Sequence, residues 1–167
     1  MCMMCDGASP EEVDQWMEAT IARAGWAVTG VEDDHVVDWA YTVGLVDGFN
    51  HPELIVVGMD WGWAGSTLNE IGERVRAGER FGSTSMVDIG EHLFPLGPVD
   101  PEQFDHEVFN GWTSYYGNHV QEYVPPVALQ VFPPLCLVER GGDPGRWSLD
   151  TPAEVLGDRT PRNSNQR

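Results

Sequence analysis

The chain has 167 residues, enough for one domain with a hydrophobic core, and its 41% apolar and 10% aromatic residues exclude a fully disordered protein. It carries 27 acidic and 9 basic residues, a net charge of −18, and every basic residue is arginine. The lack of lysine excludes a phosphate-binding P-loop and Schiff-base chemistry, and the negative charge disfavours nucleic acid and membrane surfaces as partners.

The first predicted helix begins at a well-formed N-terminal signal. Ser9 is suited to the N-cap, Pro10 occupies the first helical position and Glu12 completes a capping box. Apolar residues then recur at helical spacing up to Gly25, which stands where a left-handed C-terminal cap belongs. A strand over residues 26–31 is expected to follow.

Two β-rich segments, residues 38–45 and 53–59, are separated by a connection of about seven residues. A parallel crossover requires a dozen residues or more, so these two strands should pair antiparallel. A second helix should follow, with Ser66 as its N-cap and Gly78 at its end. Further strands are expected at residues 81–89, 92–99, 127–132 and 135–139, and a more helical interval near residues 101–123.

Strands mostly follow strands along the chain, an order typical of an α+β domain rather than of a doubly wound parallel sheet. We therefore predict one α+β domain over residues 1–139, with a small antiparallel, barrel-like sheet and two or three helices. Residues 140–167 differ in composition, with 4 acids and 5 arginines against 23 acids and 4 arginines in residues 1–139. They have little apolar surface to bury and should form a partly docked, mostly flexible tail.

The cellular location is inferred from two absent patterns. No apolar run approaches the roughly 18 residues of a membrane span. The start of the sequence, Met1 to Asp6, lacks the basic-then-apolar layout of a signal peptide. We therefore expect a cytoplasmic protein.

Several short motifs occur in a fixed order along residues 2–132. They are Cys2-x-x-Cys5-Asp6-Gly7, Gly25-Trp26, Tyr41-Thr42-Val43-Gly44-Leu45 and His51-Pro52-Glu53-Leu54, followed by a helix that ends at glycine. As an ordered set they resemble the bacterial domain-of-unknown-function 4262 family, which has no assigned reaction. The order of strands and helices is also similar, at the level of architecture, to flavin-reductase-like split barrels, in which a small antiparallel barrel holds a flavin nucleotide.

The first candidate function is binding of a small planar ligand, with an FMN-like flavin as the leading candidate. Trp61 and Trp63 flank a glycine after a strand and could provide a stacking surface. Contacts to the flavin phosphate would come from the segment that follows: Arg74, Arg76, Arg80, Ser83, Thr84 and Ser85. The two tryptophans fit a homodimer interface equally well, and simple core filling somewhat better.

Cys2 and Cys5 form a CxxC pair just before the first helix, whose N-terminus favours thiolates. Packing of soft cysteine and methionine side chains at the edge of the core is the simplest interpretation. A redox pair would normally open directly into its helix, whereas Cys5 lies four residues ahead of the cap. A zinc site would need two more ligands from among His35, His51, His92, His106 and His119.

His51 is the candidate catalytic residue, because an imidazole at a strand entrance could act as general acid or base, or bind metal together with Glu53. We favour the simpler interpretation that Pro52 sets the turn and His51 caps it by hydrogen bonding. A second aromatic cluster, residues 112–119, offers tyrosine hydroxyls and His119 for a polar pocket wall, and its glycine and asparagine indicate a loop. The common serine hydrolase, zinc protease and Rossmann motifs are absent, and whether the protein is an enzyme stays open.

A third candidate belongs to a different class of protein. The net charge of −18 would steer a cationic partner toward this chain, as in an acidic interaction protein or the immunity half of a toxin pair. The same acidity also fits simple solubility or adaptation to salt. Zinc binding, flavin binding and recognition of a basic partner are therefore the three functional hypotheses.

Overall fold

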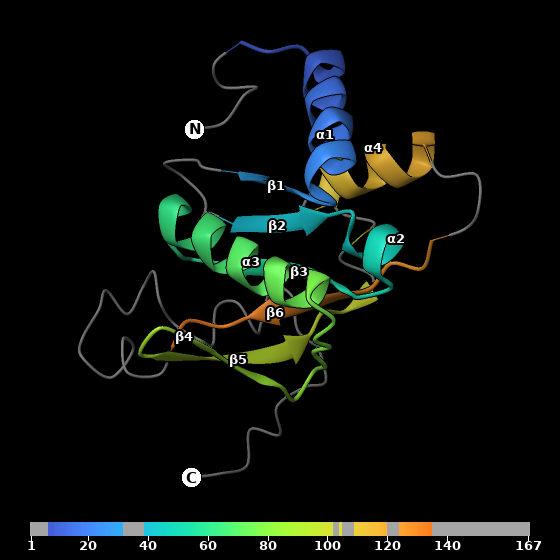
Figure 1. Ribbon diagram of the computed structural model, residues 1–167. Helices are drawn as coiled ribbons and strands as arrows, with labels where there is room; N and C mark the ends of the chain where they lie inside the picture. The colour runs from blue at the N-terminus through green and yellow to red at the C-terminus, as the bar shows by residue number, and fades with distance from the viewer. Residues whose placement is uncertain (1–6, 32–38, 102–103, 105–108, 120–123, 135–167) are drawn as a thin grey trace, which may run out of the picture.

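The structure is a computed structural model that describes residues 7–31, 39–101, 104, 109–119 and 124–134 (Figure 1). Cys2, Cys5, the strand predicted at 135–139 and the predicted C-terminal tail lie outside these described residues. The elements in chain order are α1 (Pro10–Ala24), β1 (Ala27–Val31), β2 (Trp39–Val43), α2 (Leu45–Phe49), β3 (Glu53–Val57), α3 (Trp61–Arg76), β4 (Met86–Ile89), β5 (His92–Pro98), α4 (Asn110–His119) and β6 (Ala128–Val131).

The six strands form one sheet in the order β1-β2-β3-β6-β5-β4. The predicted chain reversal is confirmed, because β2 and β3 pair antiparallel with Tyr41 opposite Ile55. The α+β class is also confirmed, but the expectation of an antiparallel, barrel-like sheet is wrong in two respects. β3 pairs parallel with β6, and among the described strands β1 and β4 each have a partner on one side only, so the sheet is not closed. The parallel pair joins strands that are distant in sequence, and local patterns carry no information on such a pairing.

Helix α1 has the predicted boundaries. The Ser9 hydroxyl accepts the N–H of Glu12, the Glu12 carboxylate accepts the N–H of Ser9, and Gly25 ends the helix with a φ of 91°. The predicted start of the next helix is wrong. Asp60 rather than Ser66 is the N-cap of α3, and its carboxylate accepts the N–H of Gly62. Aspartate caps helices as well as serine does, so the helix begins at the first suitable residue after β3.

The short connection between β2 and β3 forms α2, which the sequence patterns did not predict. Gly44 precedes this helix with a φ of 115°, a conformation that suits glycine and few other residues. A Cβ atom on Gly44 would also lie 2.9 Å from the carbonyl oxygen of Gly25. The end of β2 therefore approaches the end of α1 at a distance that only glycine allows.

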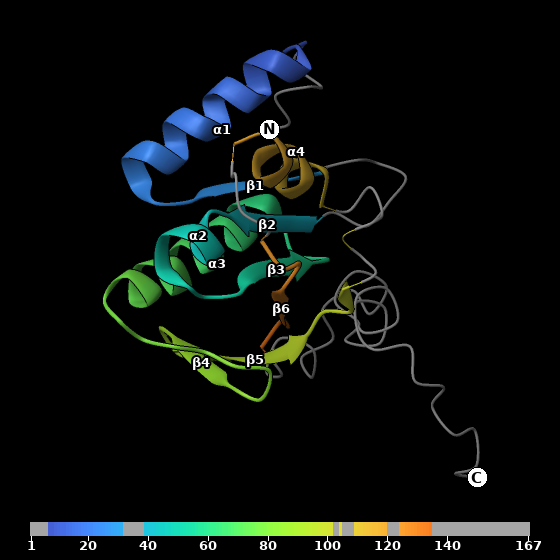
Figure 2. The same cartoon turned by 90° about the vertical axis from the view of Figure 1, so that its right-hand side faces the viewer.

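Both faces of the sheet are covered. On β3, Leu54 and Val56 pack against α3, whereas Ile55 and Val57 belong to the core on the opposite face. Helices α1 and α4 cover that opposite face and lie beside each other in both views (Figures 1 and 2). Within the described ranges, none of the helices has the length and apolar character needed to cross a membrane.

Candidate functional site

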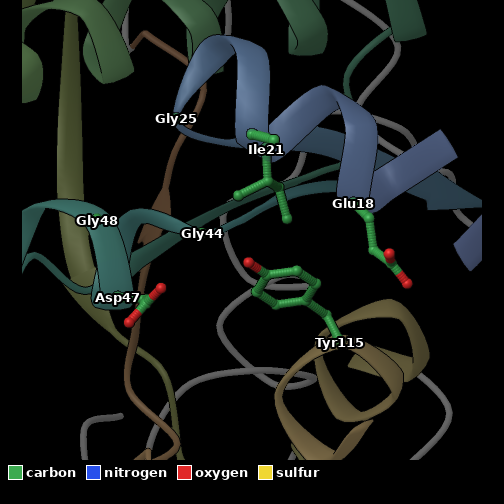
Figure 3. Close-up of a pocket in the computed structure, with 8 residues that line it drawn as sticks. Glu18, Ile21, Gly25, Gly44, Asp47, Gly48 and Tyr115 are labelled. Atoms are coloured by element: carbon green, nitrogen blue, oxygen red, sulfur yellow. The ribbon is translucent and has the colours of Figure 1, made fainter. Parts of the chain in front are cut away.

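A groove of about 430 Å³ opens between α1, α2 and α4 (Figure 3). We refer to it as the acidic groove, because two of its lining residues are acidic and none is basic. The eight lining residues are Glu18, Ile21, Ala22, Gly25, Gly44, Asp47, Gly48 and Tyr115. The three glycines add no side chains, so the groove is open between the end of α1 and the start of α2.

The ring of Tyr115 lies across the acidic groove, between Asp47 and Glu18 (Figure 3). Partial burial raises the pKa of the Tyr115 phenol, and the negative charges of Asp47, Glu18 and Glu53 raise it further. The phenol therefore stays protonated at neutral pH. The carboxylates of Asp47 and Glu18 make the groove a region of negative potential, which favours a cation.

Glu53 is fully buried behind the groove, at the start of β3. Its Oε1 accepts hydrogen bonds from the N–H of Gly44 (2.9 Å), the N–H of Val46 (3.2 Å) and the hydroxyl of Tyr116 (2.8 Å). Its Oε2 accepts the hydroxyl of Thr42 at 2.6 Å. We refer to this carboxylate and its four donors as the Glu53 cluster. An ionised carboxylate only accepts hydrogen bonds, and this arrangement gives it donors alone.

The Glu53 cluster joins β3 to three other elements, of which α2 and α4 border the groove. Thr42 lies on β2, Gly44 and Val46 lie at the start of α2, and Tyr116 lies on α4. Burial raises the pKa of Glu53, and the four donors oppose that shift. Burial and the nearby Glu53 charge also raise the pKa of Tyr116. The cluster therefore fixes the position of α2 and α4 relative to the sheet.

His51 is buried, with 1% of its surface exposed. Its Nδ1 lies 2.7 Å from the carbonyl oxygen of Pro52, and its Nε2 accepts the N–H of Phe81 at 3.2 Å. The carbonyl partner requires a proton on Nδ1, which leaves Nε2 as an acceptor. Burial lowers the pKa of His51 and keeps the ring neutral. These contacts agree with the simpler interpretation of His51 as a hydrogen-bonded turn residue, because a metal or substrate would have to displace one of them.

The predicted flavin-binding residues lie along the length of α3 and beyond it. Trp61 is half-buried in the first turn of α3, whereas Trp63 in the same turn is 53% exposed and packs edge-on against His92. Arg74 and Arg76 lie in the last turn. The helical rise of about 1.5 Å per residue places the two ends of this set, Trp61 and Arg76, about 22 Å apart along the axis.

Each predicted phosphate-binding arginine has protein partners. The Arg74 guanidinium pairs with Glu79 at 2.7 Å and donates to the Asp88 carbonyl. Arg76 pairs with Glu73 and lies 4.5 Å from the centre of the Trp26 ring. Arg80 donates to the carbonyls of Val75, Glu79 and Phe49. A phosphate would therefore have to compete with existing contacts at each of the three. Of the hydroxyl residues, Ser83 and Thr84 are exposed, and Ser85 accepts the N–H of Gly82.

Sequence reasoning identified Tyr115 and Tyr116 as part of an aromatic cluster. The helical interval expected near residues 101–123 is confirmed at this cluster, and the interpretation of residues 112–119 as a loop is wrong. Residues 110–119 form α4, and Tyr115 lines the groove. Gly117 and Asn118 indicated a loop, yet both lie within this helix. Gly111, in the first turn, serves close packing, because a Cβ there would lie 2.9 Å from the Tyr41 hydroxyl. The roles of Glu18, Asp47 and the Glu53 cluster were missed, because no local pattern marks them. The nearest signal in the sequence was the Tyr41-Thr42-Val43-Gly44-Leu45 segment with the Pro52-Glu53 pair that follows it, because these segments contain Thr42, Gly44 and Glu53 of the cluster.

No group of three or more potential metal ligands occurs among the residues that the structure describes. Comparison with known proteins finds one matching family. No curated protein and no solved structure matches the chain. The family match spans residues 20–134. It includes the whole Glu53 cluster and all of the groove except Glu18. The match covers more than half of the sequence, so the chain belongs to the family described as Domain of unknown function (DUF4262).

Proposed function

We propose that this chain is a binding protein for a basic partner, and that the acidic groove accepts a cationic side chain of that partner. The observation that carries the proposal is the composition of the groove: two carboxylates, from Asp47 and Glu18, beside one aromatic ring, that of Tyr115. A cation is attracted both to carboxylates and to the face of an aromatic ring.

The walls of the groove also suit the rest of such a side chain. Ile21 and Ala22 provide apolar surface, against which the aliphatic stem of lysine or arginine can pack while its charged head meets the carboxylates. Contacts of this kind bury apolar and charged parts of one side chain together. The groove volume, about 430 Å³, lies within the range of roughly 300–1,000 Å³ that is usual for ligand sites.

The charge of the whole chain favours the same class of partner. A net charge of −18 accelerates the encounter with a basic protein and repels acidic ones. Exposed charges are screened within about 10 Å at 0.1 M salt, so binding should weaken as salt is added. Binding that did not respond to salt would contradict the proposal.

The test is an NMR titration with an uncharged host peptide that carries one arginine, compared with the same peptide carrying neutral citrulline. We expect saturable shifts of groove residues with arginine only. Asp47→Asn should weaken binding about five- to tenfold, because it removes one charged partner of the cation. Glu91→Gln is the matched control, because Glu91 is exposed and lies in the turn beside β4, at the sheet edge opposite β1. Equal binding of citrulline, or no binding at all, would overturn the proposal.

Flavin binding is a second candidate, supported by one observation, the exposed ring of Trp63. A planar ligand could stack on that ring. The visible spectrum of the purified protein and the fluorescence of added flavin test it, and no absorbance with no quenching would exclude it. The zinc hypothesis rests on Cys2 and Cys5, and elemental analysis of untagged protein tests it.

A further inference from the structure

Tyr115 is backed by a second tyrosine whose position is fixed. The rings of Tyr115 and Tyr116 meet edge to face, with centroids 5.1 Å apart and an interplanar angle of 83°. The Tyr116 ring also packs against Trp112 at 5.0 Å, and its hydroxyl donates to the buried carboxylate of Glu53. The ring of Tyr115 therefore packs against a tyrosine that is hydrogen-bonded to the Glu53 cluster.

The two carboxylates of the groove lie on opposite sides of that ring (Figure 3). Asp47 comes from α2 and Glu18 from α1, while the ring itself comes from α4. A ligand that lies on the ring and pairs with both carboxylates must present donors in more than one direction from a flat group. The fixed ring supplies the plane, and the carboxylates supply acceptors at its two ends.

Arginine meets this requirement and lysine does not. A guanidinium is planar, stacks on aromatic faces and carries five N–H donors in a rigid arrangement. An ammonium is a compact charge that is strongly hydrated, so it loses more solvation when it enters an apolar-walled groove. Lysine would keep the attraction of the negative field but would lose the stacking and one of the two carboxylate contacts.

We propose that the acidic groove selects arginine over lysine, and that Glu53 acts as a positioning residue that sets this preference through Tyr116 and Tyr115. The inference rests on the proposed function and adds the class of side chain recognised and the residue that controls the choice. Glu53 does not touch the ligand in this arrangement, because it is fully buried behind the groove. Its effect passes through one hydrogen bond and one ring contact.

The experiment measures the ratio of dissociation constants for two host peptides that differ only in one lysine or arginine. We expect the unmodified protein to prefer arginine about tenfold, the effect of stacking and of one extra charged contact together. Tyr115→Leu should reduce the ratio to about two, because the stacking surface is lost. Tyr115→Phe keeps the ring and should keep the ratio. A ratio near one in the unmodified protein would overturn the inference.

Tyr116→Phe tests the positioning role, because it removes the hydrogen bond to Glu53 and keeps the ring. We expect the ratio to fall at least threefold while the affinity for lysine stays within about twofold. A general loss of structure would weaken both peptides alike and leave the ratio unchanged, and that result would overturn the role of Glu53. Glu91→Gln, measured in parallel, should leave the ratio at its original value.

The possible outcomes separate the two proposals. If neither peptide binds the unmodified protein, the proposed function fails, and the inference fails with it. If both bind equally and citrulline does not, the proposed function stands and only the preference for arginine is overturned. If arginine is preferred but Tyr116→Phe keeps the full ratio, the role of Glu53 is overturned.

Discussion

Two buried polar side chains on neighbouring strands, Glu53 on β3 and Gln130 on β6, have opposite surroundings. Both are 0% exposed. Glu53 accepts four hydrogen bonds, from two backbone N–H groups and two hydroxyls. Neither amide atom of Gln130 has a hydrogen-bond partner among the described residues. Burial of a polar group therefore identifies no function by itself, and the partners of the group distinguish a structural anchor from a source of instability.

The position of Gln130 explains why its amide has no hydrogen-bond partner within the part of the chain that the structure describes. On β6 it alternates with Leu129 and Val131, which pack against α3, so it faces the opposite core. Its neighbours across the sheet are Ile55 on β3 and Gly97 on β5, and neither carries a polar side chain. Glu53, in contrast, stands at the start of β3, beside the turn after β2, where the backbone N–H groups of Gly44 and Val46 are available. Backbone N–H groups beside strand ends are thus available to side chains, whereas those at strand centres are used in the hydrogen bonds of the sheet.

The largest effect that tests this contrast should come from Glu53→Ala. It removes the acceptor of four donors at once, and we expect the free energy of unfolding to fall by about 3–5 kcal/mol. Urea denaturation measures the change. Glu53→Gln is the matched control, because its amide oxygen can still accept from Gly44, Val46 and Tyr116. We expect it to cost about 1 kcal/mol. Equal losses for the two variants would show that the four donors find other acceptors.

Features of this fold were predicted from the sequence where the residues that form them are close together in the chain, and were missed where those residues are far apart. The capping box of α1 and the reversal between β2 and β3 depend on residues close together in sequence, and both were predicted. The start of α3 was misplaced because Asp60 and Ser66 are both suitable caps. The Glu53 cluster joins residues from 42 to 116, and no local pattern contains it. The parallel partner of β3 was missed for the same reason.

The next effect has the opposite sign. Gln130→Met replaces a buried amide that has no hydrogen-bond partner among the described residues with an apolar side chain of similar shape. We expect it to raise the free energy of unfolding by about 1–2 kcal/mol. Thermal and urea unfolding measure it. Ile55→Met, a change on the facing strand that removes no polar atom, is the control, and we expect a loss of less than about 1.5 kcal/mol. Destabilisation by Gln130→Met would show that the amide has a partner beyond the described residues, and the contrast with Glu53 would disappear.

A smaller effect should come from Tyr116→Phe, which removes one of the four donors to Glu53 and keeps the ring packed against Trp112. We expect a loss of about 1 kcal/mol in the free energy of unfolding, the usual net value of one hydrogen bond. Tyr115→Phe is the matched control, because the hydroxyl of Tyr115 is not part of the Glu53 cluster, and it should change stability less. A larger loss for Tyr115→Phe would contradict the assignment of Tyr116 as the link between α4 and β3.

The smallest effect is a gradual change of the free energy of unfolding with pH, and it arises from the protonation of Glu53. Burial raises the pKa of Glu53 in the folded protein above its unfolded value, so the folded state holds this proton at a pH where the unfolded state has lost it. Stability from this group is therefore present below the unfolded pKa and falls as pH rises through the folded pKa.

His51 contributes a pH dependence of the opposite sign, because burial lowers its pKa and the neutral ring is favoured as pH rises. Urea unfolding at a series of pH values separates the two, since Glu53→Gln should remove the fall and leave the rise. An unchanged profile in that variant would mean that the four donors outweigh burial and keep the carboxylate ionised throughout.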